Sequence, residues 1–296
     1  MYRYQTLICG KLVRRINRFV CEVIIDGFAD VTLCYMANPG SMLGMCIAGA
    51  PIRASRAPEG SSKFEYRVEG IKIGNVWIGC NTLLANKIIS SLLMNNSLVQ
   101  RSLIPKYDSF RHEVREGTTR FDFVTLADNP KSTTIIEVKT VTMASNWYDI
   151  EIDNTRADRP IPRFPSSRPP ECCIRDNRIL ALFPDCQSKR AQKHVAHLAS
   201  CSKRQSTISV MVFVVVRDDV DAVAPSEYCD PAYAALVRKF CGKEVSCLAL
   251  KFRMHLEDPL NSFVEFIGDI PVYVSEEPDP PEGPMTGYES KRVRYR

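Results

Sequence analysis

The sequence lacks the long apolar runs that would anchor it in a membrane. No stretch of about eighteen consecutive apolar residues occurs, although a helix that spans a bilayer needs about twenty. The first residues also lack the apolar segment and small-residue cleavage site of a secretory signal. We therefore expect an intracellular protein, cytoplasmic or nuclear and not secreted, with no membrane partner.

The twelve cysteines contain no C-x-x-C pair, so the usual zinc-finger spacing is absent. Free thiols in a reducing compartment are the favoured interpretation. A strong charge of one sign is missing too, because 39 Lys+Arg face 34 Asp+Glu, a net charge of +5. The excess lies in residues 1–110, where 13 basic residues face 7 acidic ones. This balance permits an anionic partner without requiring one.

The first eighty residues read as a small β module. Asp26-Gly27 and Gly74-Asn75 are turn signals between short alternating or apolar runs. Such closely spaced strands favour a small barrel, which leaves no open sheet edges. The predicted strands are residues 7–14, 19–26, 31–35, 50–54, 66–73 and 76–80.

After Asn81 the periodicity changes to that of an α/β domain. Apolar residues follow a helical spacing over 82–93, and Asp230-Pro231 before Gly242 has the start and stop signals of a helix. Residues 208–216 form a nearly continuous β-branched run, typical of a buried central strand. A helix is expected over 189–201, and further strands over 113–115, 120–126, 134–142, 246–252 and 263–274.

The predicted domains are therefore 1–80, a β-barrel, and 81–274, an α/β domain. Residues 145–180 hold five of the nineteen prolines and few apolar clusters, so we interpret them as an inserted loop. The segment 275–296 has no core pattern, and we expect a disordered tail.

The main chemical pattern joins two of the predicted strands. Asp122 lies between two phenylalanines, and Glu137 and Lys139 are two residues apart, so they share one strand face. If the strands pair, the two carboxylates meet and can bind Mg²⁺ (or Mn²⁺) through oxygen. Lys139 would then orient a water or stabilise developing negative charge. This is the logic of the PD-(D/E)xK nucleases, in which all three residues act in catalysis.

That spacing alone is weak, because a Glu–Lys pair on an exposed strand face is a common structural feature. His194 and His197 form H-x-x-H, but no further ligand is spaced nearby, which disfavours a zinc site. Trp77 could stack on a base, although filling the barrel is the favoured interpretation.

Further short motifs run in order through residues 7–274. They are Gly10 to Arg15 with Arg18-Phe19, Asn38-Pro39-Gly40-Ser41-Met42, Asn81-Thr82-Leu83 with Ala85-Asn86-Lys87, Glu113-Val114-Arg115, Arg120-Phe121-Asp122-Phe123, Glu137 to Thr142, Phe183-Pro184-Asp185, Arg190, Lys193-His194 and Asp230-Pro231-Ala232-Tyr233. Together these motifs resemble those of the sugar fermentation stimulation protein family.

The resemblance implies an N-terminal OB-like β-barrel followed by a PD-(D/E)xK restriction-endonuclease-like α/β domain. It also implies DNA binding and a link to the regulation of sugar-utilisation genes, and the fold implies nuclease activity. This chain has Ser90-Ser91 where the family helix usually carries an acid, which leaves Glu113 as the candidate third metal ligand beside Asp122 and Glu137. Ser188-Lys189-Arg190 likewise replaces an acid of the family by a base.

Basic side chains on both predicted domains are candidates for binding a polyanion, against the alternative of a solvated basic surface. Lys189, Arg190 and Lys193 fall on one side of a helix, and His194 belongs to a family motif. The full set is Arg14, Arg15, Arg18, Arg120, Lys189, Arg190, Lys193 and His194.

Three functions stay open on the sequence. The first is a DNA-binding protein with a nuclease-like domain and a divalent-metal site, with RNA not excluded. The second is a Mg²⁺-dependent endonuclease. The third is a non-catalytic regulatory protein that recruits a partner through 145–180. Oligomeric state is open in all three.

Overall fold

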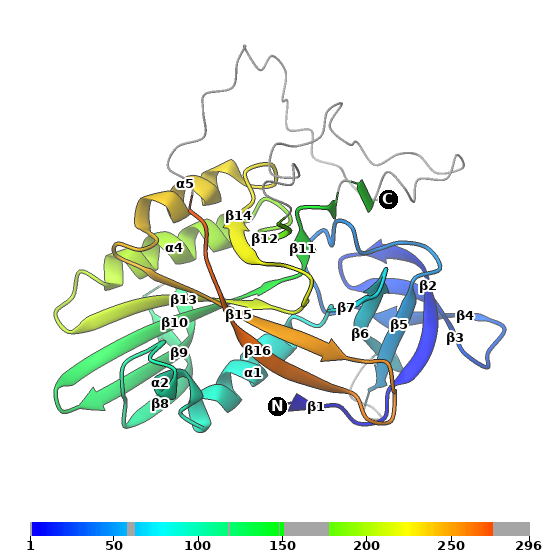
Figure 1. Cartoon of the computed structure of the whole chain (residues 1–296), viewed down its shortest axis with the longest axis horizontal. Coiled ribbons are helices and arrows are strands. Elements are labelled where there is room, and N and C mark those ends of the chain that lie inside the picture. Colours follow the sequence, from blue (N-terminus) through cyan, green and yellow to red (C-terminus); the bar gives the residue numbers. More distant parts are fainter. Residues whose placement is uncertain (1, 58–62, 118, 148, 151–177, 275–296) are drawn as a thin grey trace, which may run out of the picture.

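The computed structural model describes residues 2–57, 63–117, 119–147, 149–150 and 178–274. Within these residues the first part of the chain forms a six-stranded sheet in the order β4-β3-β2-β5-β6-β7, and an additional β4–β6 pairing closes it into an OB-like barrel (Figure 1). Its strands are β2 (Ile8–Asn17), β3 (Val20–Ile25), β4 (Val31–Tyr35), β5 (Pro51–Arg56), β6 (Tyr66–Ile73) and β7 (Val76–Gly79).

Each predicted strand of the barrel is present, with ends that differ by a few residues. Alternation explains the result: in β3, Cys21, Val23 and Ile25 point into the core, and the residues between them point outward. Gly27 has φ of 88° in the turn between β3 and β4, a conformation that glycine adopts without strain.

The second part is built on a seven-stranded sheet in the order β1-β16-β15-β13-β10-β9-β8. The first strand, β1, comes from the extreme N-terminus and pairs with β16. The strands are β1 (Tyr2–Arg3), β8 (Ser109–Glu116), β9 (Thr119–Asp128), β10 (Lys131–Val141), β13 (Thr207–Val215), β15 (Ser246–His255) and β16 (Phe263–Ile270).

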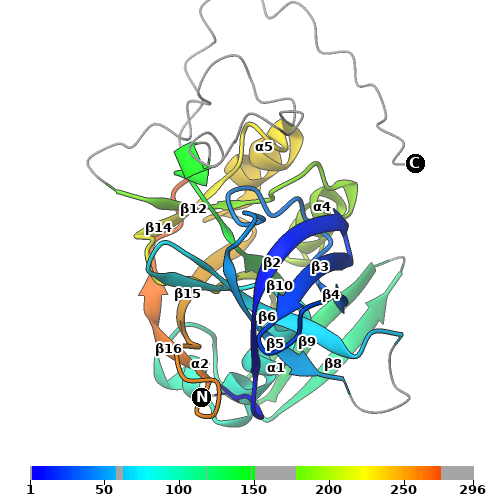
Figure 2. The same cartoon turned by 90° about the vertical axis from the view of Figure 1, so that its right-hand side faces the viewer.

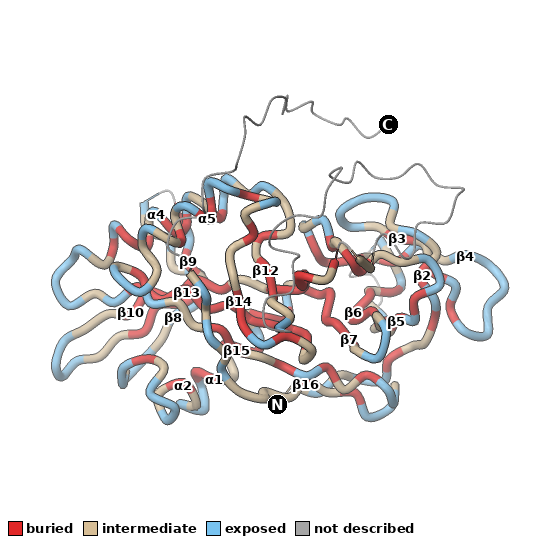
Figure 3. The backbone as a smooth tube through the Cα atoms, turned by 45° about the horizontal axis from the view of Figure 1, so that its top comes forward, coloured by how far each residue is buried: buried red, intermediate tan, exposed pale blue. Residues whose placement is uncertain are grey.

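Helices cover both faces of this sheet (Figure 1). Helices α1 (Leu83–Met94) and α2 (Ser97–Gln100) pack on one face, and α4 (Lys189–Cys201) and α5 (Pro231–Phe240) pack on the other. The central strand β13 serves both cores, because Val212 faces α1 whereas Phe213 faces α4 and α5. The buried tube along β13 in Figure 3 reflects this double coverage, as its β-branched run predicts.

A small three-stranded sheet completes the fold beside α5, in the order β11 (Met143–Ala144), β12 (Leu180–Phe183), β14 (Ala222–Pro225). Helix α5 starts as predicted, with the side chain of Asp230 accepting a hydrogen bond from the Tyr233 N–H and Pro231 in the first turn. Most of the predicted insert, residues 151–177, and the predicted tail, residues 275–296, lie outside the described residues.

The barrel strands lie in front of the larger sheet in Figure 2, and two contacts fix this arrangement. Asn81 is buried between them: its Nδ2 donates to Glu69 of β6 at 2.8 Å, and its Oδ1 accepts from the Leu83 N–H at the start of α1. Trp77 is buried too, but it belongs to the core cluster of Met254, Leu256 and other residues of the larger domain. The prediction that Trp77 fills the barrel is therefore wrong: on β7 it alternates with Ile78, and Ile78 takes the inward position.

No helix among the described residues is long and apolar enough to cross a bilayer.

Candidate functional site

Asp122 and Glu137 meet at the point where β9 and β10 pair. The antiparallel register sets Phe123 opposite Ile136. Asp122 directly precedes Phe123 and Glu137 directly follows Ile136, so the two acids come next to each other. The Val138 N–H donates to Asp122 Oδ2 at 2.8 Å, and Asn86 Nδ2 of α1 donates to Oδ1 at 2.8 Å. Two hydrogen bonds therefore fix the Asp122 carboxylate in one orientation.

Glu137 lies deeper, with 2% of its surface exposed. Its Oε1 accepts a hydrogen bond from Lys139 Nζ at 2.5 Å and also contacts Nδ1 of the buried His194 on α4. Lys139 Nζ and His194 Nδ1 are 3.3 Å apart. The other carboxylate oxygen, Oε2, is buried and has no hydrogen-bond partner. An unpartnered buried carboxylate oxygen is costly, and a bound cation is one arrangement that would satisfy it.

The fold shifts the pKa values of the two carboxyl groups in opposite directions. Burial and the nearby Glu137 carboxylate raise the pKa of Asp122, outweighing the Val138 N–H, Asn86 and Lys139. Burial would also raise the pKa of Glu137, but Lys139 and His194 outweigh it and hold that pKa below its usual value. Glu137 is thus the more permanently charged of the pair.

Glu113 approaches the site from the neighbouring strand. On β8 it lies between His112 and Val114, which pair with Phe123 and Phe121, so Glu113 is level with Asp122. It has a φ of +50°, a left-handed conformation that is strained for a residue with a side chain and that clusters at functional sites. Its exposed carboxylate lies 3.4 Å from the Arg120 guanidinium. The predicted nucleic-acid ligand Arg120 is therefore an ion-pair partner of the predicted metal ligand Glu113.

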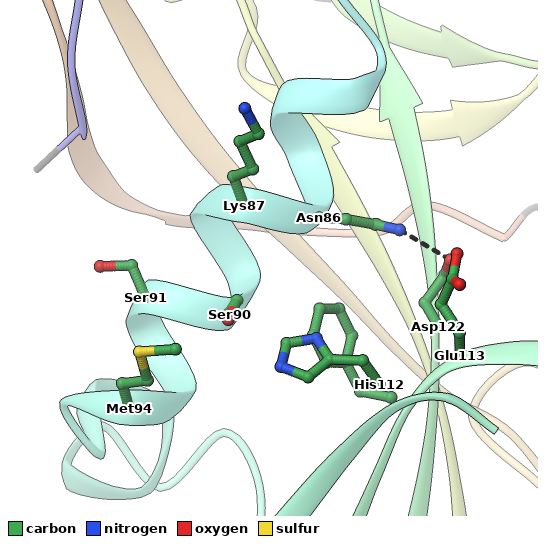
Figure 4. A pocket seen from close by; sticks show the side chains of 9 residues that line it. Asn86, Lys87, Ser90, Ser91, Met94, His112, Glu113 and Asp122 are labelled. Carbon is green, nitrogen blue, oxygen red and sulfur yellow. Dashed lines mark hydrogen bonds between the residues drawn. The ribbon is translucent and has the colours of Figure 1, made fainter.

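A cavity of about 520 Å³ opens beside Asp122, between α1 and the β8–β9 hairpin (Figure 4). Its lining comes from both elements: Asn86, Lys87, Ser90, Ser91, Met94, His112, Glu113, Asp122 and Phe123. Asn86 bridges the two walls through its hydrogen bond to Asp122. The cavity gives a ligand direct access to one of the two central carboxylates.

The donor set fits a hard divalent cation with two protein carboxylates. Mg²⁺ is commonly held by one or two carboxylates together with water and phosphate oxygens. Asp122 and Glu137 are mutually close enough for their charges to interact, and Glu137 Oε2 is unpartnered. Within the described ranges, no group of three or more His, Cys, Asp or Glu side chains is arranged to hold a metal ion. Glu113 thus lies beside Asp122 and Glu137, but the three carboxylates are not arranged as a metal-binding group.

The barrel arginines have separate environments. Arg15 is half-buried and donates to the backbone carbonyls of Asn38, Ser41 and Arg18 at 2.7, 3.0 and 2.9 Å, so it supports a loop. Arg14 forms a two-bond ion pair with Glu22 across β2 and β3. Arg18 is exposed and lies near Cys186, where burial and the Asp185 carboxylate raise the pKa of the thiol and the Arg18 guanidinium offsets only part of that rise.

The basic residues of α4 divide along the helix. Lys189, Arg190 and Lys193 are exposed in its first turns, whereas His194 is buried against Glu137. The expected contact of His194 with phosphate remains a prediction, and in the structure its Nδ1 is engaged with the acid. The three cations thus occupy the exposed side of a helix whose buried side reaches the carboxylate site.

Two residues that join distant segments of the chain were not among the predicted site residues. Asn86 was seen only as part of a motif, and nothing in its spacing showed that it would reach Asp122 from another element. Asp185 is the second: it accepts from the Met42 N–H at 2.8 Å and so joins the larger domain to the barrel loop that Arg15 supports. In both cases the contact is between segments distant in sequence.

The chain folds into a closed OB-like barrel and a helix-covered sheet, one strand of which ends in the acid-x-lysine pattern. This architecture is that of a two-domain protein with a nuclease-like second domain. Residues 13–80 match the model of the SfsA N-terminal OB domain. Residues 83–150 and 171–258 match the model of the sugar fermentation stimulation protein RE domain. The chain belongs to the sugar fermentation stimulation protein family.

Bacterial relatives match most of the chain. A sugar fermentation stimulation protein homolog of Geotalea daltonii is 30% identical over 258 residues, 87% of this chain and 95% of its own. The homolog of Rippkaea orientalis is 28% identical over 257 residues, 86% of this chain and 91% of its own. The fold is similar to that of Pyrococcus furiosus SfsA, solved in complex with Ca²⁺, with a TM-score of 0.68, 20% identity, and coverage of 92% of this chain and 99% of that one.

Proposed function

We propose that this protein binds DNA and hydrolyses its phosphodiester bonds with a divalent ion, Mg²⁺ or Mn²⁺, held by Asp122 and Glu137. The observation that carries the proposal is the buried, unpartnered Oε2 of Glu137 beside Asp122, with Lys139 next to both. The Ca²⁺ of the Pyrococcus furiosus relative supports a site for a hard, oxygen-binding cation.

A bound divalent ion would supply polarisation of the phosphate and a lowered pKa of the attacking water. The chain's own residues supply orientation and charge. Asn86 and the Val138 N–H hold the Asp122 carboxylate, and His194 holds Glu137. The Lys139 ammonium, at the edge of the buried cluster, would stabilise negative charge that develops on the phosphate. Glu113 could add a third carboxylate by exchanging its Arg120 partner.

The test is cleavage of single- and double-stranded DNA and RNA with Mg²⁺, Mn²⁺ or EDTA. Asp122→Ala and Lys139→Ala should each lower metal-dependent cleavage by about a hundredfold or more, since changes even to groups that only support a metal ligand lose about 10–100-fold. Asp128→Ala, which removes an exposed acid at the end of β9, is the matched control. Absence of metal-dependent cleavage on every substrate would reject the hydrolytic part and leave DNA binding to be tested by itself.

Binding is tested by its salt dependence. If Lys189 and Arg190 each neutralise a phosphate, alanine at either position should lower the slope of log K against log salt by about one. Lys131→Ala, at the opposite end of β10 from Lys139, should leave the slope unchanged. An unchanged slope in Lys189→Ala and Arg190→Ala would remove α4 from the DNA-binding surface.

A further inference from the structure

The cavity beside Asp122 is much larger than a metal ion needs. Its volume of about 520 Å³ falls within the roughly 300–1,000 Å³ of pockets that bind small organic ligands. Asn86 and Asp122 belong to both the cavity lining and the carboxylate site. A ligand in the cavity would therefore lie directly beside a phosphate held at Asp122.

One wall of the cavity offers a flat aromatic surface. The exposed His112 ring packs against Phe123, with centroids 5.0 Å apart, and against Phe110 at 5.2 Å. These neighbours hold the imidazole in place. Met94, at the end of α1, is 66% exposed, and in Figure 4 its thioether points toward the same hollow. A planar ring between them would cover apolar surface that is otherwise open to water.

The helical wall adds polar groups and no negative charge. Asn86, Ser90 and Met94 are four residues apart in α1 and so form one stripe along the cavity. The helix carries Lys87 and no acidic residue, so it does not repel a phosphate. The Ser90 hydroxyl provides a partner for the polar edge of a base.

We infer that this cavity receives one unpaired nucleoside of the substrate strand, so that the protein acts on single-stranded or locally opened DNA. A base inside a stacked duplex cannot reach such a pocket without leaving its stack. Stacking on His112 would accept any base, because every base has a π-face. The inference rests on the proposed function, which places the phosphate at Asp122.

The test fills the cavity and measures binding, not cleavage, both with Ca²⁺ as the cation and in EDTA. The probes are a short labelled single-stranded DNA and the same sequence as a duplex. Ser90→Trp, which occupies the cavity, and His112→Ala, which removes the platform, should each weaken single-strand binding by about tenfold, the size of one lost stack. Duplex binding should not change. Leu83→Trp, at an exposed position of α1 outside the cavity, is the matched control and should bind both probes normally.

The outcomes separate this inference from the proposed function. Single-strand affinities of Ser90→Trp and His112→Ala equal to that of Leu83→Trp would overturn the nucleoside site, even if Asp122→Ala abolishes cleavage. Weaker single-strand binding in both variants, with no cleavage by the unmodified protein in any metal, would support the nucleoside site and reject the hydrolytic function. Equal weakening for single strand and duplex would also overturn the inference, because the cavity would then not distinguish an unpaired base.

Discussion

Two acidic residues of the larger domain, Glu137 and Asp185, both lie in motifs, yet their surroundings differ. Glu137 has one oxygen shared by Lys139 and His194 and a second, buried oxygen with no partner. Asp185 instead receives backbone N–H groups from Ser41 and Met42 of the barrel loop. Its carboxylate fits so closely that a Cβ at Gly40 would lie 2.2 Å from Oδ1.

This difference separates motif residues that hold the fold together from motif residues that can still bind a ligand. A carboxylate whose oxygens are occupied by backbone groups joins segments of the fold, whereas one with an unmet oxygen has capacity left for a ligand. Asp230 belongs with Asp185: it is fully buried and accepts from Ser188 N, Gln192 Nε2 and Tyr233 N, which ties α4 to α5. By this criterion Glu137 has an oxygen left for a ligand, as the proposed function requires, whereas Asp185 and Asp230 belong to the scaffold.

The largest expected effect is on activity. Glu137→Gln keeps the size of the side chain but removes the charge that a cation needs, so metal-dependent cleavage should fall by about a hundredfold or more. The rise in melting temperature on adding Mn²⁺ should disappear in the same variant, since a ligand stabilises only a state that binds it. If Glu137→Gln kept both the metal-dependent cleavage and the rise in melting temperature with Mn²⁺, the metal would bind elsewhere, and Glu137 would not differ in role from Asp185.

The next effect is on stability. Gly40→Ala should lower the free energy of unfolding by about 1–3 kcal/mol, because the new methyl group overlaps the Asp185 carboxylate. Urea denaturation measures this loss. In an Asp185→Ala background the same change should be much less destabilising, since the overlapping carboxylate is gone. Equal losses in the two backgrounds would show that Gly40 is needed for another reason.

The smallest effect is a difference in pH dependence between the two acids. The pKa of Glu137 is lowered on folding, so its stabilising contribution is present above its unfolded value of 4.5 and is lost as pH falls through the folded pKa. Burial raises the pKa of Asp185, so ionisation destabilises the fold, and stability recovers as pH falls toward its unfolded value of 3.8.

Urea denaturation in EDTA across this pH range checks the prediction. The free energy of unfolding of the unmodified protein minus that of Glu137→Gln should fall as pH falls. The free energy of unfolding of the unmodified protein minus that of Asp185→Asn should rise over the same pH range. If the two differences in unfolding free energy changed in the same direction with pH, the opposite pKa shifts of Glu137 and Asp185 would be contradicted.

Much of the fold and part of the site follow from local patterns. Alternation along 19–26 and 66–73, the β-branched run of β13 and the Asp230-Pro231 signal each depend on neighbours in sequence, and the structure confirms all of them. The pairing of β9 with β10, which brings Asp122 and Glu137 near each other, could also be predicted from the two strand patterns. Trp77 could not be placed, because either side of β7 leads into a core.

Periodicity and motif order were enough to predict the strands and helices, the acid-x-lysine strand end and the family. Which charged groups already have partners became clear only from the folded structure. Arg15 holds three carbonyls, His194 contacts Glu137, and Asn86 reaches Asp122 from another element. The physical reason is that the partner of a polar group is set by packing between distant segments, and one chain position can meet a backbone carbonyl, a carboxylate or water without any change in the local pattern.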